Sequence, residues 1–207
     1  MVGSAHTFGM RSLALLIATL ISPVASAHAQ VDYYAGLGIT GSTKLIRDFI
    51  VQEIEVQPSL APTLLLGASL VFAPTYRAGL EFGLTSASYH SSELGVDTDL
   101  GTLRTGSLLL NLEGPVAKRL NWRAGLGLIS YWPAQQEGIF LQGGQARFLV
   151  GAGLDYRPPL LNHWDLLLAL RYDFHRFTTD QLKTLGFSGS QGVQRLSLSA
   201  GLARARR

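Results

Sequence analysis

The chain has 207 residues, of which 17 are basic and 14 acidic, and it contains no cysteine. The absence of cysteine excludes disulfides, thiolate catalysis and cysteine-ligated metal sites. Most arginines stand singly within alternating segments and only residues 203–207 form a basic cluster, so the net charge of +3 does not predict a nucleic-acid partner.

The N-terminal segment predicts a cleaved signal peptide. Arg11 precedes an apolar run at residues 13–21, and the small residues Ala25, Ala27 and Ala29 form cleavage sites of the A-x-A type. The run has about ten apolar residues, which is too short to cross a membrane as a helix. We therefore predict a signal peptide at residues 1–29, removed on export, and one domain over residues 30–207.

Residues 121–156 predict two β-strands joined by a loop. The even positions from Trp122 to Trp132 form an aliphatic face with tryptophan at both ends, and the odd positions include Arg123. From residue 146 the alternation returns, with Phe148 and Tyr156 at the ends of the apolar face. About ten residues of alternation match a strand that crosses a bilayer at a tilt. Aromatic rings at both ends of an apolar band suit the outside of a transmembrane barrel.

The same pattern recurs along the rest of the chain and predicts an all-β protein. One strand ends at Phe72 and has a clear register only from Leu64, and its beginning stays open between a tall strand from Ile54 and the preceding loop. We predict an eight-stranded antiparallel up-and-down transmembrane β-barrel, with strands at about 31–40, 64–72, 76–85, 102–113, 121–132, 146–156, 163–175 and 195–202.

The connections between these strands alternate in length. Long connections are predicted at 41–53, 86–101, 133–145 and 176–192, and short ones at 73–75, 114–120 and 157–162. Long loops of such barrels face outside, so both termini are predicted to be periplasmic. The outward aromatic residues form two girdles: Tyr33, Phe72, Tyr76, Trp122, Tyr156 and Trp164 at the turn end, and Trp132, Phe148, Tyr172 and Phe174 at the loop end.

Charged residues share the inward register. A charge in a narrow lumen is costly unless it is paired, so these side chains are expected to form mutual salt bridges that fill the interior. The predicted network consists of Arg77, Glu81, Arg123, Arg147, Asp155, Arg157, Asp165, Arg171, Asp173 and Arg195. The body of the barrel is then a closed scaffold, and activity is expected in the loops.

A soluble lipocalin-like periplasmic carrier is the alternative for an eight-stranded barrel. Its apolar face would point inward around a ligand, and its polar face would meet water. The polar face here is rich in glycine, serine and threonine, whereas lysine is scarce. The aromatic rings also lie at the ends of the apolar face, and both features favour the membrane barrel.

The mature chain resembles the small outer-membrane barrels of Gram-negative bacteria, the group that includes the transmembrane domain of outer membrane protein A. The resemblance is architectural, because no residue-specific motif carries it. It implies an outer-membrane location, insertion by the barrel-insertion machinery, and a monomer. It also implies contact with outer-membrane lipid and lipopolysaccharide, for which Arg104, Arg147, Arg176 and Lys183 are the basic candidates near the outer rim.

One segment offers a candidate catalytic group. His90 and Ser92 have a spacing similar to the His-x-Ser of outer-membrane lipid A deacylases, with Glu93 as a possible orienting carboxylate. The acid of those enzymes lies about a dozen residues further on, where this chain has Arg104. A lipid A-modifying hydrolase therefore stays open, but the segment is predicted to be a polar surface loop and the chain to be no enzyme.

Cofactors and metals are not predicted. The run from Gly36 to Gly41 matches the dinucleotide motif G-x-G-x-x-G, but nothing downstream supplies the crossover helices that the motif requires. His163, Asp165, Asp173 and His175 are spread along one strand and are too far apart to bind one metal ion.

Overall fold

The computed structural model describes residues 31–48, 54–93, 96–134, 146–161, 163–178, 183 and 191–204. The predicted signal peptide and most of the predicted loops at 133–145 and 176–192 lie outside the described residues. Among the described residues, no helix is long and apolar enough to cross a membrane.

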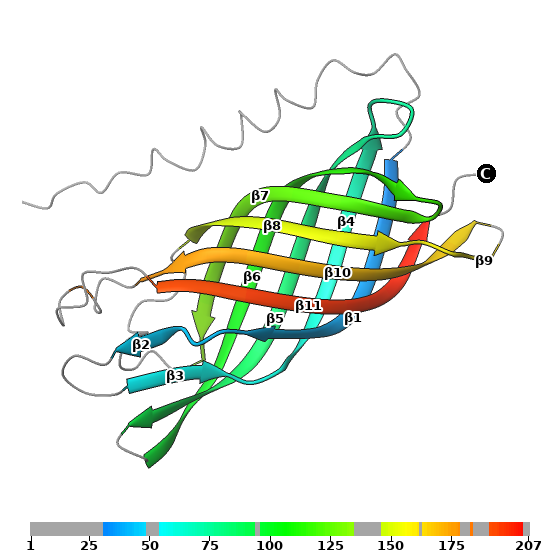
Figure 1. The fold of residues 1–207 in the computed structure, drawn as a ribbon. Coiled ribbons are helices and arrows are strands. Elements are labelled where there is room, and N and C mark those ends of the chain that lie inside the picture. The colour runs from blue at the N-terminus through cyan, green and yellow to red at the C-terminus, as the bar shows by residue number, and fades with distance from the viewer. Residues whose placement is uncertain are drawn as a thin grey trace, which may run out of the picture. The chain divides into compact units, whose positions relative to one another are not determined.

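Eight strands close into a ring. Each is antiparallel to both neighbours, and the last strand pairs with the first through a register that runs from Tyr34–Ala203 to Ser42–Arg195. This confirms the predicted eight-stranded antiparallel barrel (Figure 1). The barrel strands are β1 (Val31–Ser42), β4 (Ala61–Val71), β5 (Arg77–Glu93), β6 (Val96–Ala117), β7 (Leu120–Pro133), β8 (Ala146–Tyr156), β10 (Trp164–Phe177) and β11 (Gln191–Arg204).

Three short strands extend the barrel at its two ends. β2 (Ile46–Asp48) and β3 (Ile54–Pro58) form a hairpin that continues β1 and β4, and β3 pairs with β5 beyond the end of β4. The open choice for this part of the chain is thus resolved in favour of a tall strand, interrupted at residues 59–60. β9 (Pro159–Leu161) pairs with β10 at the opposite end (Figure 1).

The predicted long loop at 86–101 is wrong. β5 and β6 stay paired as far as Glu93 and Val96, so this segment is mainly a tall two-stranded hairpin. The prediction relied on an apolar outer face, which ends at Leu84. A strand that rises above the lipid needs no such face, while its inward side chains Ala87 and Tyr89 remain buried.

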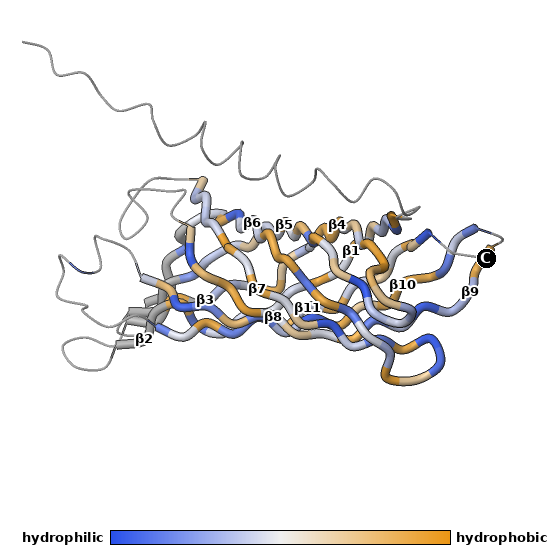
Figure 2. Tube along the Cα trace, turned by 90° about the horizontal axis from the view of Figure 1, so that it is seen from above, coloured by the Kyte–Doolittle hydropathy of each residue, from blue (hydrophilic) through white to orange (hydrophobic). Residues whose placement is uncertain are grey.

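The barrel exposes apolar side chains on its outer face and buries charged side chains in its interior. Outward leucines such as Leu37, Leu126 and Leu196 are more than half exposed, whereas the inward Arg123 and Asp155 are almost fully buried. Hydrophobic residues recur along the barrel strands in Figure 2. This distribution is the reverse of the lipocalin alternative, in which the apolar face would line the interior. An apolar outer face of this kind suits contact with lipid.

Contact of the outer face with lipid can be tested by placing one arginine at the middle of the barrel and another at its turn end. Leu126 lies midway along β7 and Leu160 lies on β9 at the turn end, and both are exposed. For the protein folded in lipid vesicles, Leu126→Arg should lower the free energy of unfolding by about 2–4 kcal/mol, while Leu160→Arg should change it by about 1 kcal/mol or less. Denaturant titrations measure both, and equal small effects would indicate that the outer face meets water.

Candidate functional site

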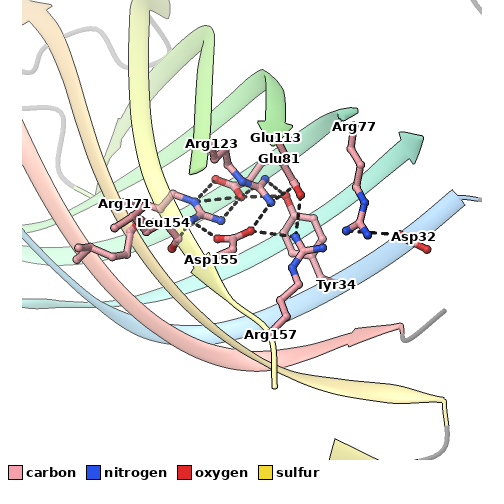
Figure 3. A network of polar contacts seen from close by, with 11 residues as sticks. Asp32, Tyr34, Arg77, Glu81, Glu113, Arg123, Leu154, Asp155, Arg157 and Arg171 are labelled. Atoms are coloured by element: carbon pink, nitrogen blue, oxygen red, sulfur yellow. Dashed lines mark hydrogen bonds and ion pairs between the residues drawn. The ribbon is translucent and has the colours of Figure 1, made fainter. Parts of the chain in front are cut away.

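An ionic network fills the turn-side half of the lumen, and Arg123 on β7 lies at its centre (Figure 3). Its Nη1 lies 2.7 Å from Glu81 Oε2, and its Nη2 lies 2.7 Å from Asp155 Oδ2. Nη2 also donates a hydrogen bond to Glu113 Oε1. One buried guanidinium therefore joins carboxylates from β5, β6 and β8.

Two further arginines complete the network. Arg171 on β10 donates through Nε to Glu81 Oε1 at 3.0 Å and through Nη1 to Asp155 Oδ1 at 2.5 Å. Arg157 donates through Nη2 to Glu113 Oε2 at 3.0 Å and to Asp155 Oδ2 at 2.9 Å. With Arg123, three arginines thus face three carboxylates, so the charges balance within this network.

Tyr34 on β1 extends the network across the barrel. Its hydroxyl donates to Glu81 Oε2 at 2.9 Å and accepts from Arg123 Nη1, and the Arg123 guanidinium lies 4.9 Å from the centre of its ring. The ring occupies the space above Gly67 of β4, where an added Cβ would come within 2.0 Å of it. A side chain at position 67 would therefore displace Tyr34 from the network.

Strand register explains why these groups meet. Glu113, Arg123, Gly153 and Arg171 occupy one continuous row of paired positions across β6, β7, β8 and β10. Gly153 separates the two arginines, and a Cβ there would lie 2.5 Å from the Leu170 carbonyl and 3.0 Å from Arg171. The missing side chain leaves room for two guanidinium groups in a narrow lumen.

The other predicted network residues lie apart from this centre. Arg77 lies 3.8 Å from Asp32 at the turn end, and Arg147 donates to the Thr178 carbonyl at 2.6 Å. Asp165 and Asp173 are half-buried on β10. The structure thus brings together Glu81, Arg123, Asp155, Arg157 and Arg171 from the predicted set, and it adds Glu113 and Tyr34.

A layer of hydroxyl groups lies above the ionic network. Thr40 Oγ1 lies 2.5 Å from Thr63 Oγ1 and 2.7 Å from Ser197 Oγ. Arg195 Nη2 donates to Thr85 Oγ1 at 2.9 Å and to the Thr105 hydroxyl at 3.2 Å. Within the described part of the chain, Arg195 is therefore held by hydroxyls rather than by the ionic network in which it was predicted.

The loop-side half of the lumen is apolar. Ile129, Leu149 and Val193 are fully buried, and the Tyr131 ring packs edge-on against Phe177 with ring centres 5.2 Å apart. The Tyr131 hydroxyl is also hydrogen-bonded to His175 Nε2. This cluster was not predicted, because the predicted lumen consisted of the charged inward residues alone. Ionic, hydroxyl and apolar layers together close the lumen.

Solved structures share this architecture. Neisserial surface protein A superimposes with a TM-score of 0.54 at 11% identity, covering 86% of this chain and 99% of that one. The fold is that of the small outer-membrane barrels. AlkL in lipid bilayers gives 0.54 at 15% identity, over 89% and 95% of the two chains. Ail of Yersinia pestis, in complex with the heparin analogue sucrose octasulfate, gives 0.50 at 15% identity, over 84% and 99%.

Sequence comparison gives no closer relationship. No family model matches the chain, and no curated protein matches it. Identities of this size show the fold alone.

The ten aromatic residues of the predicted girdles all lie on the outward register of this barrel. Eight are exposed, and Trp122 and Phe174 are half-buried. The Trp122 ring covers Gly114, and Phe72 lies 6.5 Å from Tyr76 between ring centres at the turn end. Aromatic residues therefore occupy outward positions near both ends of the strands, as the headgroup regions of a bilayer favour.

Residues near the loop end occupy different faces. Arg104 and Arg176 are exposed at outward positions, and Lys183 is exposed as well, whereas Arg147 has the inward register. His90 is exposed on β5, and its backbone pairs with Asp99. The segment of His90 and Ser92 is therefore a strand rather than the predicted loop.

Removal of Arg123 tests the ionic network. Arg123→Met leaves Glu81, Glu113 and Asp155 with fewer cationic partners, so the free energy of unfolding in vesicles should fall by about 3–5 kcal/mol. Adding Glu113→Gln to Arg123→Met should recover part of the loss, because one fewer negative charge is left buried. Arg104→Met on the outer face is the control and should cost about 0.5 kcal/mol or less. Similar costs at positions 123 and 104 would contradict the network's role.

Proposed function

We propose that the chain is an integral outer-membrane protein whose closed barrel presents extracellular loops for contact with the cell surface or a partner. The supporting observation is the apolar outer face, which surrounds an interior that buries the ionic network. In water such an outer face would drive aggregation, whereas lipid chains solvate it. The chain is proposed to be a monomer inserted by the barrel-insertion machinery.

The filled lumen favours an anchoring role over general diffusion. The turn-side half holds the ionic network, and the loop-side half holds the cluster around Ile129 and Leu149. An eight-stranded barrel has a cross-section that side chains can fill completely. Two different layers therefore obstruct the same path, and loss of one would leave the other in place.

The proposed surface contacts are with anionic groups. Arg104 and Arg176 are exposed on the outer face near the loop end, where arginine can grip a phosphate through two hydrogen bonds. Lys183 is proposed to contribute as well. Ail holds a sulfated sugar, sucrose octasulfate, in its structure. By analogy of fold, lipopolysaccharide phosphates are the partner class that we propose here.

The proposed orientation puts both termini in the periplasm. β1 begins and β11 ends at the side of the turns β4–β5 and β6–β7, since Tyr34 pairs with Ala203. The opposite end carries the β2–β3 hairpin and the tall β5–β6 hairpin. In outer-membrane barrels the taller side faces outward.

Cell fractionation tests this function. The protein should be recovered with the outer membrane, and in mild detergent it should migrate differently on a gel before and after boiling, because the closed barrel resists unfolding until heated. An inserted tag at residues 94–95, between β5 and β6, should be accessible to antibody on intact cells. Recovery in the soluble periplasmic fraction would contradict the proposal.

The rival function is a lipid A-modifying hydrolase that uses His90 and Ser92. Mass spectra of lipid A from cells with and without the protein decide between the two functions. The proposed surface role predicts identical acylation, whereas loss of an acyl chain that Ser92→Ala abolishes would establish the hydrolase. Ser88→Ala, on the same strand, is the matched control for an effect specific to position 92.

A further inference from the structure

An apolar groove of about 590 Å³ lies on the outer face of the barrel near the loop end. Outward side chains of three adjacent strands line it, with Ile39 on β1, Leu196 and Leu198 on β11, and Tyr172 on β10. Leu60, from the connection between β3 and β4, contributes a further wall and is 73% exposed. The groove therefore opens on the face that lipid would cover.

Gly41 explains why the surface is hollow at this place. It occupies an outward position of β1 between Ile39 and Thr43, opposite Leu196, and the Leu60 side chain would lie 3.4 Å from an added Cβ. The other outward glycines that the structure describes are covered, because an aromatic ring lies 2.6–3.0 Å from the added Cβ. They are Gly106 beneath Trp132, Gly114 beneath Trp122 and Tyr76, and Gly192 beneath Phe174.

The groove is polar at the end nearer the loops. Thr43 and Gln194 line it there, and the backbone N–H of Gln194 donates to the Thr43 hydroxyl at 3.0 Å. Arg176 on β10 pairs with Gly192, two residues beyond Gln194 along β11, and is exposed on the same outer face. Two residues of strand span about 7 Å, so Arg176 lies about that far beyond the polar end of the groove, on the neighbouring strand β10.

We propose that the groove binds one lipid A molecule, with an acyl chain along Ile39, Leu60 and Leu196 and a phosphate at Arg176. The order of surfaces matches that of the ligand, because the apolar groove leads to hydroxyl and amide groups and then to a cation. The inference rests on the proposed function, since only the outer leaflet would bring lipid A to this face. It assigns to Arg176 the phosphate of a lipid A molecule whose acyl chain occupies the groove.

Native mass spectrometry of the full mature chain folded in detergent tests the site with diphosphoryl lipid A as the probe. The folded barrel should retain one lipid A. Gly41→Phe should weaken retention by about tenfold, because the ring fills the groove, and Arg176→Gln should weaken it by about tenfold through loss of a charge-assisted contact. Lipid A without its phosphates should bind more weakly and be insensitive to Arg176→Gln.

Two controls separate the groove from the general surface. Ala124 is an exposed outward residue in the same row of paired positions as Gly41, through Leu196, Tyr172 and Ala152, so Ala124→Phe adds the same bulk elsewhere. Arg204→Gln removes an exposed outward arginine from the turn end of β11. Both control variants should retain lipid A as the parent protein does.

Several results would overturn the inference. They are equal retention by all variants, equal losses in the control variants, or equally tight binding of phosphatidylglycerol. Heat-dependent gel migration establishes that each variant is folded. A folded barrel that does not retain lipid A would overturn this inference and the proposed lipopolysaccharide contact, but not the outer-membrane barrel itself. A chain that forms no heat-modifiable barrel would contradict the whole proposed function and this inference with it.

Discussion

The cost of removing charge from water governs the interior of this barrel. Arg123, Arg157 and Arg171 lie among Glu81, Glu113 and Asp155, all nearly inaccessible to solvent. An isolated buried ion costs several kcal/mol, so each charge depends on the geometry of its partners. Those partners come from β5, β6, β7, β8 and β10. A slip of one residue between neighbouring strands would move a charge to the lipid side, and the network therefore favours a single register.

The same constraint separates the molecule into regions with different tasks. The ionic network lies in the lumen, and leucine and aromatic residues dominate the outer face between the loop end and the turn end. Above the last outward leucine of β5, Leu84, the hairpin of β5 and β6 continues without a lipid-facing band. Its inward residues belong to the apolar cluster instead. The hairpin therefore extends the barrel wall beyond the lipid and supports the extracellular end that we propose to be functional.

The barrel could be predicted from the sequence because successive side chains of a strand point to opposite faces. A strand with one apolar and one polar face therefore alternates in sequence. β8 has the predicted bounds, 146–156, and the outward residues of every barrel strand have the expected face. Prediction was wrong where a strand leaves the lipid, as at 86–101, because the outward apolar signal stops there while backbone pairing continues.

The lumen was harder to predict than the outer face. Glu113 follows the outward Leu112, and Tyr34 lies between outward residues, so their inward direction could have been found from the alternation. Which inward charges meet depends on the stagger of the strands, and the alternation within one strand carries no information about it. This is why Asp165 and Arg195 were grouped with the central network although the structure holds them elsewhere.

A membrane-spanning barrel requires that the apolar outer face meet lipid rather than water. Because the chain has no cysteine, single cysteines can carry spin labels at Leu126, Leu110 and Leu196 on the outer face and at His90 on the tall hairpin. In reconstituted vesicles, the three leucine positions should be accessible to dissolved oxygen and shielded from a water-soluble nickel complex, with the reverse at His90. Nickel accessibility at Leu126 equal to that at His90 would contradict the membrane-spanning barrel.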